Sequence, residues 1–453
     1  MNPQSFAQFT SRIAGEVIVP GSQAYDHVRT VFNNRAGNPA VIVRAQNHDD
    51  IVTALRLARE QHLLVSVRSG GHGLSGLATN NGGLVLDLTH FNRIELLDPE
   101  HALVRIGAGA RWGDAARALA AHGLSLSSGD TNQVGVGGLT LGGGIGWMVR
   151  KYGLTIDSLH AAQLITADGR LLRVSADEHP DLFWAIRGGG GNFGIVTSFD
   201  FYAQHCPTII GGSVVYDPAE VESVLPAWAD AMRQAPEELN STIVLLSGFG
   251  PQVPAQVTVL LCYTGDDETA ANRAIKPLLH LGTVKGQNIQ KKPYYAILED
   301  AVAPPPPLKA ATHDGFLKTL TSETLSVMAA NYGKPGTPIL QVRSLGGAMA
   351  RVSPQATAFA HRENEALAVM AAFVPANASE EQAHTMRRAA WRPLEPYSSG
   401  AYLNFLSEAS EASVAEVYPS ATYARLASIK AIYDPDNVFN QNQNIKPAAN
   451  TQA

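Results

Sequence analysis

The sequence predicts an α+β fold with mixed strand pairing, organised in two domains. Short β-rich and helix-like segments alternate over the first 200 residues, and Asp168-Gly169, a hairpin-turn dipeptide, separates two strand-like runs. From about Cys206 the glycines become fewer and the alternating apolar runs become longer. At roughly 100–200 residues per domain, a chain of 453 residues has room for two or three domains.

Local composition predicts the first strands and helices. Ala40–Ala45 is a short β-rich run (AVIVRA), and His48–His62 carries apolar residues at helical spacing after possible capping residues. A second helix is predicted over Asp114–His122, where Gly123 ends it. Further strands are predicted over Leu64–Arg68, Leu84–Leu88, Leu103–Ile106, Ala161–Ala167, Leu171–Ser175 and Ile195–Tyr202.

The second part of the chain has longer alternating runs, such as Gln256–Tyr263 and Ile339–Ser344. It also has a tetraproline, Pro304–Pro307, that must be loop or polyproline II. The tail predicts a helix over Tyr418–Ile432, closed by Tyr433-Asp434-Pro435 and followed by an asparagine-rich stretch. We therefore expect a first domain over residues 1–205, a second over residues 206–400 and a C-terminal segment over residues 401–453 that returns to the first domain.

The composition excludes several classes of function. Lys and Arg number 34 against 40 Asp and Glu, a formal net charge of −6, so no broad basic field is available for nucleic acid. The start of the chain shows no secretory signal and no run of 18 apolar residues occurs, so we expect a cytoplasmic protein without a membrane partner. Two cysteines and 14 scattered histidines predict neither a disulfide framework nor a metal site.

The glycines are unevenly distributed, with 18 of the 41 within residues 68–146 and 5 within residues 187–194. The cluster at 68–76 (RSGGHGLSG) follows a predicted strand, and its backbone N–H groups can form a nest for a pyrophosphate. A flexible turn is the alternative. The cluster at 128–147 is too long for a turn, which favours a large flat ligand or, equally, a glycine-kinked sheet edge.

The third cluster, at 187–194, contains G-x-G-x-x-G in the wrong context. A dinucleotide-binding fold needs this motif after a strand and before a helix, whereas here the helix-like Asp181–Arg187 precedes it and a strand follows. The sequence therefore excludes a nicotinamide-type Rossmann site. His72, inside the first cluster, is either an ordinary hydrogen-bonded residue or a nucleophile that its glycine neighbours leave approachable.

Six motifs, in order along the chain, carry a resemblance to a known family. They are RSGGHGLSG (68–76), GDTNQVGVGG (129–138), LGGGIGW (141–147), RKYGL (150–154), LFWAIRGGGGNFGIVT (182–197) and YDPDNVFNQNQNI (433–445). Together they resemble the berberine bridge enzyme-like FAD-linked oxidases of the vanillyl-alcohol oxidase superfamily. The matching residues are most frequent over residues 35–205 and 400–447. The resemblance implies a two-domain FAD-binding fold of the vanillyl-alcohol oxidase type, with a central antiparallel-sheet substrate domain.

The resemblance also implies roles for single residues. His72 matches the histidine bonded to the flavin 8α-methyl carbon. Thr131 stands where many members carry a second linking cysteine, so a single covalent bond to FAD is expected. Val134 matches the family's oxygen gatekeeper, where valine goes with oxidases and a bulkier residue with dehydrogenases. The implied cofactor-binding residues are Arg68, Ser69, Gly70, Gly71, His72, Gly73, Ser75, Gly76, Gly129, Thr131, Val134, Gly135, Gly137, Gly138, Gly142, Tyr152, Gly194, Val196, Asn442 and Asn444.

The segment Tyr402-Leu403-Asn404-Phe405 is similar to a Y-x-N-Y segment that lines the family's substrate pocket. Tyr402 either accepts the proton of a substrate hydroxyl or amine, for which its pKa of ~10 needs lowering, for instance by a nearby cation, or it is a pocket wall without a proton role. Phe405 departs from the family's usual tyrosine. Lys309, Arg343 and Tyr263 are further pocket candidates, for which the sequence offers no spacing argument.

The function that the resemblance implies is an FAD-dependent oxidase with Tyr402, Asn404 and Val134 as catalytic residues. It would remove a hydride from an alcohol or amine carbon of a small or medium organic substrate and return the electrons to O2 as H2O2. The alternatives are a dehydrogenase that uses a quinone or protein acceptor, and a flavin-binding protein without turnover. The identity of the substrate and the oligomeric state do not follow from the sequence.

Overall fold

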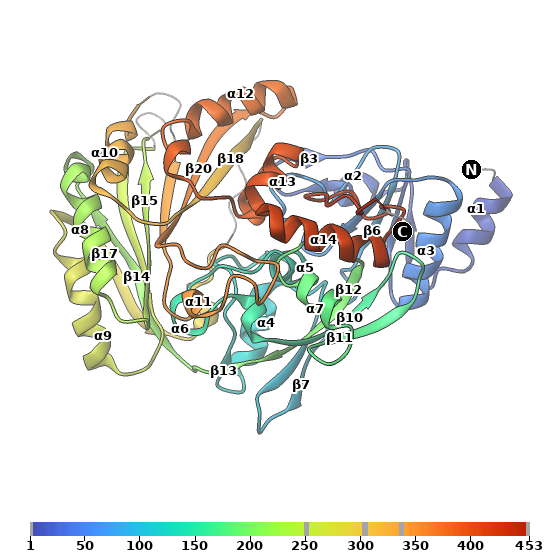
Figure 1. Ribbon diagram of the computed structural model, residues 1–453, viewed down its shortest axis with the longest axis horizontal. Coiled ribbons are helices and arrows are strands. Elements are labelled where there is room, and N and C mark those ends of the chain that lie inside the picture. The colour runs from blue at the N-terminus through green and yellow to red at the C-terminus, as the bar shows by residue number, and fades with distance from the viewer. Residues whose placement is uncertain (1–2, 249–252, 301–306, 335–338, 450–453) are drawn as a thin grey trace.

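Two lobes with different strand architecture make up the computed structural model, which describes residues 3–248, 253–300, 307–334 and 339–449. In Figure 1 the lobe at the right contains the N-terminal half of the chain, and the lobe at the left is a large antiparallel sheet with helices on its outer side. This arrangement confirms the predicted α+β class and the central antiparallel sheet.

A four-stranded sheet in the right-hand lobe positions the first glycine cluster. Its strands, in spatial order, are β1 (Glu16–Ile18), β4 (Val41–Arg44), β6 (Leu84–Asp87) and β5 (Val65–Arg68). β4, β6 and β5 pair in parallel, and apolar residues cover both faces of the sheet. Helix α3 (His48–Glu60) joins β4 to β5. The glycine cluster therefore begins where a buried parallel strand ends.

A five-stranded antiparallel sheet positions the second and third glycine clusters. Its strands, in spatial order, are β11 (Leu171–Ser175), β10 (Leu159–Ile165), β12 (Ile195–Tyr202), β8 (Leu103–Gly107) and β7 (Ile94–Asp98). The predicted hairpin between β10 and β11 is confirmed, with Gly169 at a φ of 89° in its turn. The third cluster lies between α7 (Pro180–Ile186) and β12, which confirms the reversed order that excluded a Rossmann site.

The left-hand lobe is built on a seven-stranded antiparallel sheet. Its strands, in spatial order, are β17 (Val284–Lys292), β14 (Ile209–Tyr216), β16 (Gln256–Tyr263), β15 (Leu239–Leu246), β19 (Ile339–Ser344), β20 (Ala366–Pro375) and β18 (Leu308–Leu317). Side chains alternate between the two faces of each strand, and Ile243 and Val342 pack in one core with Trp228 of α8 (Val221–Gln234). The opposite face is turned toward the other lobe.

After the large sheet the chain returns to the right-hand lobe, where Figure 1 shows α13 (Glu411–Val417) and α14 (Ser420–Tyr433) in red. α14 confirms the predicted helix in the tail, and it packs against α7. Lys430 is fully buried, lies 2.9 Å from Asp434, and donates to the carbonyl oxygens of Asn192 and Phe439. These contacts hold the tail against the third glycine cluster.

The remaining elements are short or peripheral, and Pro304–Pro306 of the tetraproline lie outside the described residues. They are α1 (Pro3–Thr10), α2 (Tyr25–Val28), β2 (Thr30–Val31), β3 (Arg35–Ala36), α4 (Trp112–Ala120), β9 (Leu124–Ser125), α5 (Val136–Leu141), α6 (Val149–Tyr152), η1 (Thr155–Ser158), β13 (Gln204–His205), η2 (Pro218–Glu220), α9 (Glu268–Ile275), η3 (Lys276–Leu279), η4 (Tyr294–Ile297), α10 (Ser322–Asn331), α11 (Ala348–Arg351), α12 (Glu380–Trp391), η5 (Glu395–Tyr397) and η6 (Leu403–Phe405).

Candidate functional site

A cavity of about 600 Å³ lies between the two lobes. The right-hand lobe lines it with all three glycine clusters and the C-terminal tail, and the large sheet lines it with residues of β15, β16 and β19. Ligand sites in proteins are typically concave, about 300–1,000 Å³ in volume, and often lie between domains. Segments that are far apart in the sequence thus form one candidate site.

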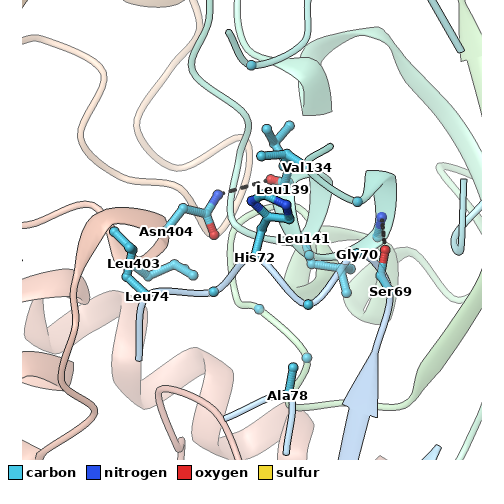
Figure 2. Close-up of a pocket in the computed structure, with 18 of the residues that line it drawn as sticks. Ser69, Gly70, His72, Leu74, Ala78, Val134, Leu139, Leu141, Leu403 and Asn404 are labelled. Atoms are coloured by element: carbon cyan, nitrogen blue, oxygen red, sulfur yellow. Dashed lines mark hydrogen bonds between the residues drawn. The ribbon is translucent and has the colours of Figure 1, made fainter. Parts of the chain in front are cut away.

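Most of the predicted cofactor and catalytic residues line this cavity. Figure 2 shows Ser69, His72, Val134 and Asn404 around it. The hydroxyl of Ser69 accepts a hydrogen bond from Gly137 N (3.2 Å), which ties the first glycine cluster to the second. The predicted residues that line the cavity are Ser69, Gly70, Gly71, His72, Gly73, Ser75, Gly129, Thr131, Val134, Gly135, Gly137, Gly138, Gly194, Val196, Tyr402, Asn404 and Asn442.

Five predicted cofactor residues lie outside the lining of the cavity. Two of them support the first glycine cluster on its side away from the cavity. Arg68 is buried, donates to the carbonyl oxygen of Val28 and lies 3.7 Å from Asp87. Gly76 has a φ of 75°, in the left-handed region that favours glycine, and a Cβ there would lie 2.3 Å from the Arg35 side chain. Both residues hold the turn in place rather than face the cavity.

The other three are Gly142, Tyr152 and Asn444. A Cβ at Gly142 would lie 2.4 Å from the side-chain amide of Asn404, so this glycine makes room for a residue of the cavity wall. Tyr152 packs against a separate apolar cluster, and burial raises its pKa to about 12. Asn444 follows Asn442 in the tail but does not reach the lining.

Bare backbone forms part of the cavity wall. A Cβ built on Gly138 or Gly191 meets no protein atom within 4 Å, so a side chain at either position would project into the cavity. Gly70 and Gly135 differ, because a Cβ on either one would lie within 2.4 Å of the other's backbone. The first pair keeps space open, and the second pair lets two glycine segments pack backbone to backbone. A cavity with such walls fits a large planar cofactor such as FAD.

His72 presents a neutral imidazole to the cavity. Burial, and to a lesser extent the charge of Arg111, lowers its pKa from 6.5 to about 4. Phe32 stacks on the ring, with the ring centroids 4.6 Å apart and the planes at 18°. Figure 2 shows the imidazole directed from its turn toward the segment that carries Val134 and Leu139. Because neutral imidazole is a nucleophile, burial keeps His72 in its reactive form at neutral pH.

Tyr402 and Asn404 form a hydrogen-bonded part of the wall. The Tyr402 hydroxyl oxygen accepts from the backbone N–H groups of Gly144 (3.1 Å) and Ile145 (3.3 Å). Asn404 Nδ2 donates to the same oxygen (2.7 Å) and to the carbonyl of Leu139 (3.2 Å). Burial raises the pKa of Tyr402 to about 12, and these bonds and a nearby cation only partly oppose it. The phenol is therefore protonated near neutral pH, and the lowered pKa that a proton acceptor would need is absent.

Gln341 and Arg343, two residues apart on β19, line the cavity from the large sheet. Arg343 pairs with Asp130 and donates to the carbonyl of Ile145 (3.2 Å). Burial would raise the pKa of Asp130, but Arg343 outweighs it and holds the pKa below its ordinary value. Gln341 was missed by the sequence analysis, although it lies two residues before Arg343 in the alternating run Ile339–Ser344 and therefore on the same face of the strand.

The other pocket candidates lie elsewhere. Lys309 donates to the carbonyl of Ala378 and pairs with Glu380 at 3.3 Å, and Tyr263 packs in the core on the far side of the large sheet. Phe32 had no sequence signal, because its contact with His72 joins a hairpin to a turn 40 residues later.

Comparison with known proteins identifies the family. The family model for FAD binding domains matches residues 39–175, and the model for berberine and berberine-like proteins matches residues 401–446. The chain is 32% identical over 461 residues to (R)-6-hydroxynicotine oxidase of Paenarthrobacter nicotinovorans, with 96% of this chain and 97% of that protein covered. The chain belongs to the berberine bridge enzyme-like family of FAD-linked oxidases.

Solved structures agree with this family assignment. 6-Hydroxy-D-nicotine oxidase from Arthrobacter nicotinovorans superposes with a TM-score of 0.84 at 30% identity, covering 96% of this chain and 98% of that chain. Xylooligosaccharide oxidase from Myceliophthora thermophila superposes with a TM-score of 0.85 at 25% identity, covering 98% and 99%. The predicted vanillyl-alcohol oxidase-type fold is confirmed, and this berberine bridge enzyme-like protein is an FAD-linked oxidoreductase.

The part of the chain that the structure describes contains no membrane-spanning helix, metal-ligating cluster or disulfide. None of its helices is both long and apolar enough to cross a membrane. No group of three or more His, Cys, Asp or Glu side chains there is placed to hold a metal ion. Both cysteines, Cys206 and Cys262, are buried and form no disulfide.

Proposed function

We propose that this berberine bridge enzyme-like oxidase removes a hydride from an alcohol or amine carbon of a small to medium organic substrate. The electrons pass to O2, which leaves as H2O2, and the flavin is held by a single covalent bond through His72. The observation that carries the proposal is a neutral imidazole in the wall of a glycine-lined cavity, in a family of FAD-linked oxidases.

Different residues of the chain would make different contacts with the cofactor. The glycine clusters would contact it through bare backbone, and His72 would tether it at the 8α-methyl carbon. Bound FAD supplies a ring that accepts a hydride, and an imidazole substituent at 8α withdraws electrons from that ring and makes it a stronger oxidant. Thr131 lines the cavity with a hydroxyl where a second link would need a thiol, which supports one covalent bond.

The substrate would lie between the flavin ring and the large sheet. Thr242, Gln341 and Arg343 offer polar groups on that wall, while Leu260 and Phe405 offer apolar surface. A wall of this mixed character suits an organic molecule that carries both hydrogen-bonding and apolar parts. The relatives named above are oxidases of a hydroxynicotine and of an oligosaccharide, so the proposal includes both amine and alcohol carbons.

The covalent bond is tested by precipitating the protein with acid and inspecting the pellet. We expect a yellow pellet from the wild type and a colourless one from His72→Ala, because the imidazole is the only proposed tether. His48→Ala is the matched control, since His48 also stacks on a phenylalanine but does not line the cavity. A colourless wild-type pellet, or flavin retained by His72→Ala, would show that the proposed link is wrong.

The electron acceptor is tested by stopped-flow reoxidation. Val134 lines the cavity with a small aliphatic side chain, which would leave room for O2 beside a bound flavin. We therefore expect the reduced enzyme to be reoxidised by dissolved O2 at a rate that sustains turnover, with H2O2 as the product. Reoxidation much slower than turnover with an artificial quinone acceptor would favour a dehydrogenase instead.

A further inference from the structure

A hairpin near the N-terminus is hydrogen-bonded to the turn that carries His72. β2 and β3 are joined by three residues that begin with Phe32, and we refer to residues 30–36 as the Phe32 hairpin. The backbone N–H of Phe32 donates to the carbonyl of Gly71 (3.0 Å), directly before His72. Arg35 donates from Nη1 to the carbonyl of Ser75 (3.2 Å) at the other side of the turn. The hairpin therefore holds the His72 turn at both ends.

The same hairpin is attached to the edge of the large sheet. Asn33, which is fully buried, donates from Nδ2 to the carbonyl of Ala310 (2.8 Å) and accepts from its N–H, as a neighbouring strand would. Asn34 donates to the carbonyl of Leu308 (2.7 Å). Ala310 and Leu308 belong to β18, an edge strand whose unpaired groups need partners. The hairpin is thus fixed to the lobe that would cover the flavin ring.

The hairpin loop has a backbone that only some residues tolerate. Asn33 and Asn34 have φ values of 68° and 54°, in the left-handed region, where asparagine is less strained than other residues with a side chain. Two consecutive residues in this conformation turn the chain sharply enough to point Phe32 at the His72 turn while Asn33 points at β18. The conformation is held by contacts on both sides.

The stacking of Phe32 on His72 defines the plane of the imidazole. The ring centroids are 4.6 Å apart, the planes differ by 18°, and both side chains line the cavity. The lone pair of a neutral imidazole lies in the plane of the ring, at its edge. A phenyl ring against the face therefore leaves the nucleophilic edge free while it restricts rotation of the side chain. The rate at which this nitrogen forms a covalent bond depends on how well it is oriented toward the atom with which it reacts.

We infer that Phe32 is a positioning residue for covalent attachment of the flavin. Asn33 supports it by fixing the Phe32 hairpin to the edge of the large sheet. The inference rests on the covalent link of the proposed function. In that step a ring nitrogen of His72 bonds to the 8α carbon, and the new C–N bond replaces the imidazole N–H and one methyl C–H. The two protons and two electrons released would pass to the flavin ring, and O2 would then remove them as H2O2.

The test follows covalent incorporation of FAD into the full chain purified from cells grown short of riboflavin. Flavin fluorescence that stays with the denatured protein gives the rate at saturating FAD and the FAD concentration for half that rate. We expect Phe32→Ala and Phe32→Leu to lower the saturating rate at least about tenfold, with half-saturation within about threefold of the wild type, because orientation and not binding is lost. Phe32→Tyr keeps the aromatic face and should retain the rate.

Two further variants separate positioning from general damage. Asn33→Ala removes both bonds to Ala310 and should lower the saturating rate in the same way. Phe91→Ala removes an equivalent phenylalanine from its stack on His48, outside the cavity lining, and should leave the rate unchanged. A wild-type rate in Phe32→Leu, or an equal loss in Phe32→Tyr, would overturn the inference while the link itself stands. A wild type that never bonds flavin would instead contradict the proposed function and this inference together.

Discussion

His72 and Tyr402 stand in the same cavity with protonation equilibria shifted in opposite directions. Burial lowers the pKa of His72 to about 4 and raises that of Tyr402 to about 12, because in both cases it disfavours the charged form. Each residue is therefore neutral near pH 7. Residue type alone assigns them ordinary values of ~6.5 and ~10, which do not reveal the depth of the cavity.

With the covalent link that we propose, the rate at which FAD bonds to His72 is expected to be constant from pH 8 down to pH 5. A pKa of about 4 leaves the imidazole neutral over this range. An imidazole with an ordinary pKa would be only about 3% neutral at pH 5 and would react roughly thirtyfold more slowly. The measurement is the covalent flavin formed over time when apoprotein and FAD are mixed at each pH. A rate that declines steadily below pH 7 would mean that His72 titrates as an exposed histidine does.

At the scale of elements, the glycine clusters act through where their backbones lie. The cluster after β5 packs against the segment that leads into α5, and the cluster before β12 meets the C-terminal tail. The sequence predicted that these segments approach something closely, but it left open whether that was a ligand or another chain segment. The structure shows a second chain segment at Gly135, which faces Gly70, and open cavity at Gly138, where a ligand has room.

Gly138→Ala and Gly135→Ala are therefore expected to change different properties. Gly138 lies in α5, where alanine favours the helix by ~0.5–1 kcal/mol, so the apoprotein should be as stable or slightly more stable. Its added methyl group projects into the cavity and should weaken FAD binding about tenfold. Gly135→Ala would place a Cβ 2.2 Å from Gly70 N and should cost ~1–3 kcal/mol of unfolding free energy. Urea unfolding and FAD titration of both apoproteins provide the comparison.

At the scale of the whole molecule, charged and polar contacts connect the two lobes around the cavity. Arg343 of the large sheet pairs with Asp130 of the second glycine cluster, and Asn33 binds the edge strand β18. The side chain of Arg343 is 6% exposed and that of Asp130 is 31% exposed, so water screens the pair only in part.

Arg343→Met is expected to lower the free energy of unfolding by about 2 kcal/mol, less than the ~3–5 kcal/mol of a fully buried pair because Asp130 is partly exposed. The pKa of Asp130 lies below 3.8, so the unfolded chain takes up this proton first as the pH falls. Its contribution to stability is complete above about pH 4 and is lost below it. The variant loses both the charge and the hydrogen bond with which Arg343 lowers this pKa, while burial, which raises it, remains, so the acid-side loss should become smaller.

Unfolding by urea between pH 3 and pH 7 measures both effects. Arg351→Met is the control, because Arg351 pairs with Glu237 at an exposed site, with side chains 62% and 41% exposed. We expect the control to change stability little at any pH. An Arg343→Met variant that keeps both the stability and the pH profile of the wild type would show that the pair does not hold the lobes together.

Much of the fold and part of the site could be predicted from local patterns. The hairpin at Asp168-Gly169, the strand before the first glycine cluster and the helix in the tail were each predicted within a few residues. Five of the predicted cofactor residues lie within the right motifs but outside the cavity lining, namely Arg68, Gly76, Gly142, Tyr152 and Asn444. A motif shows which residues are neighbours in the chain, but not which of them point to the ligand.

By itself, the sequence determined the family, the FAD cofactor and the positions of His72 and the glycine clusters, because these depend on the order of residues within short segments. Only the tertiary structure decided that Phe32 stacks on His72, that Arg343 meets Asp130 and that Tyr402 is buried. These contacts join segments far apart in the chain, and burial and charge pairing are properties of the space those segments enclose together.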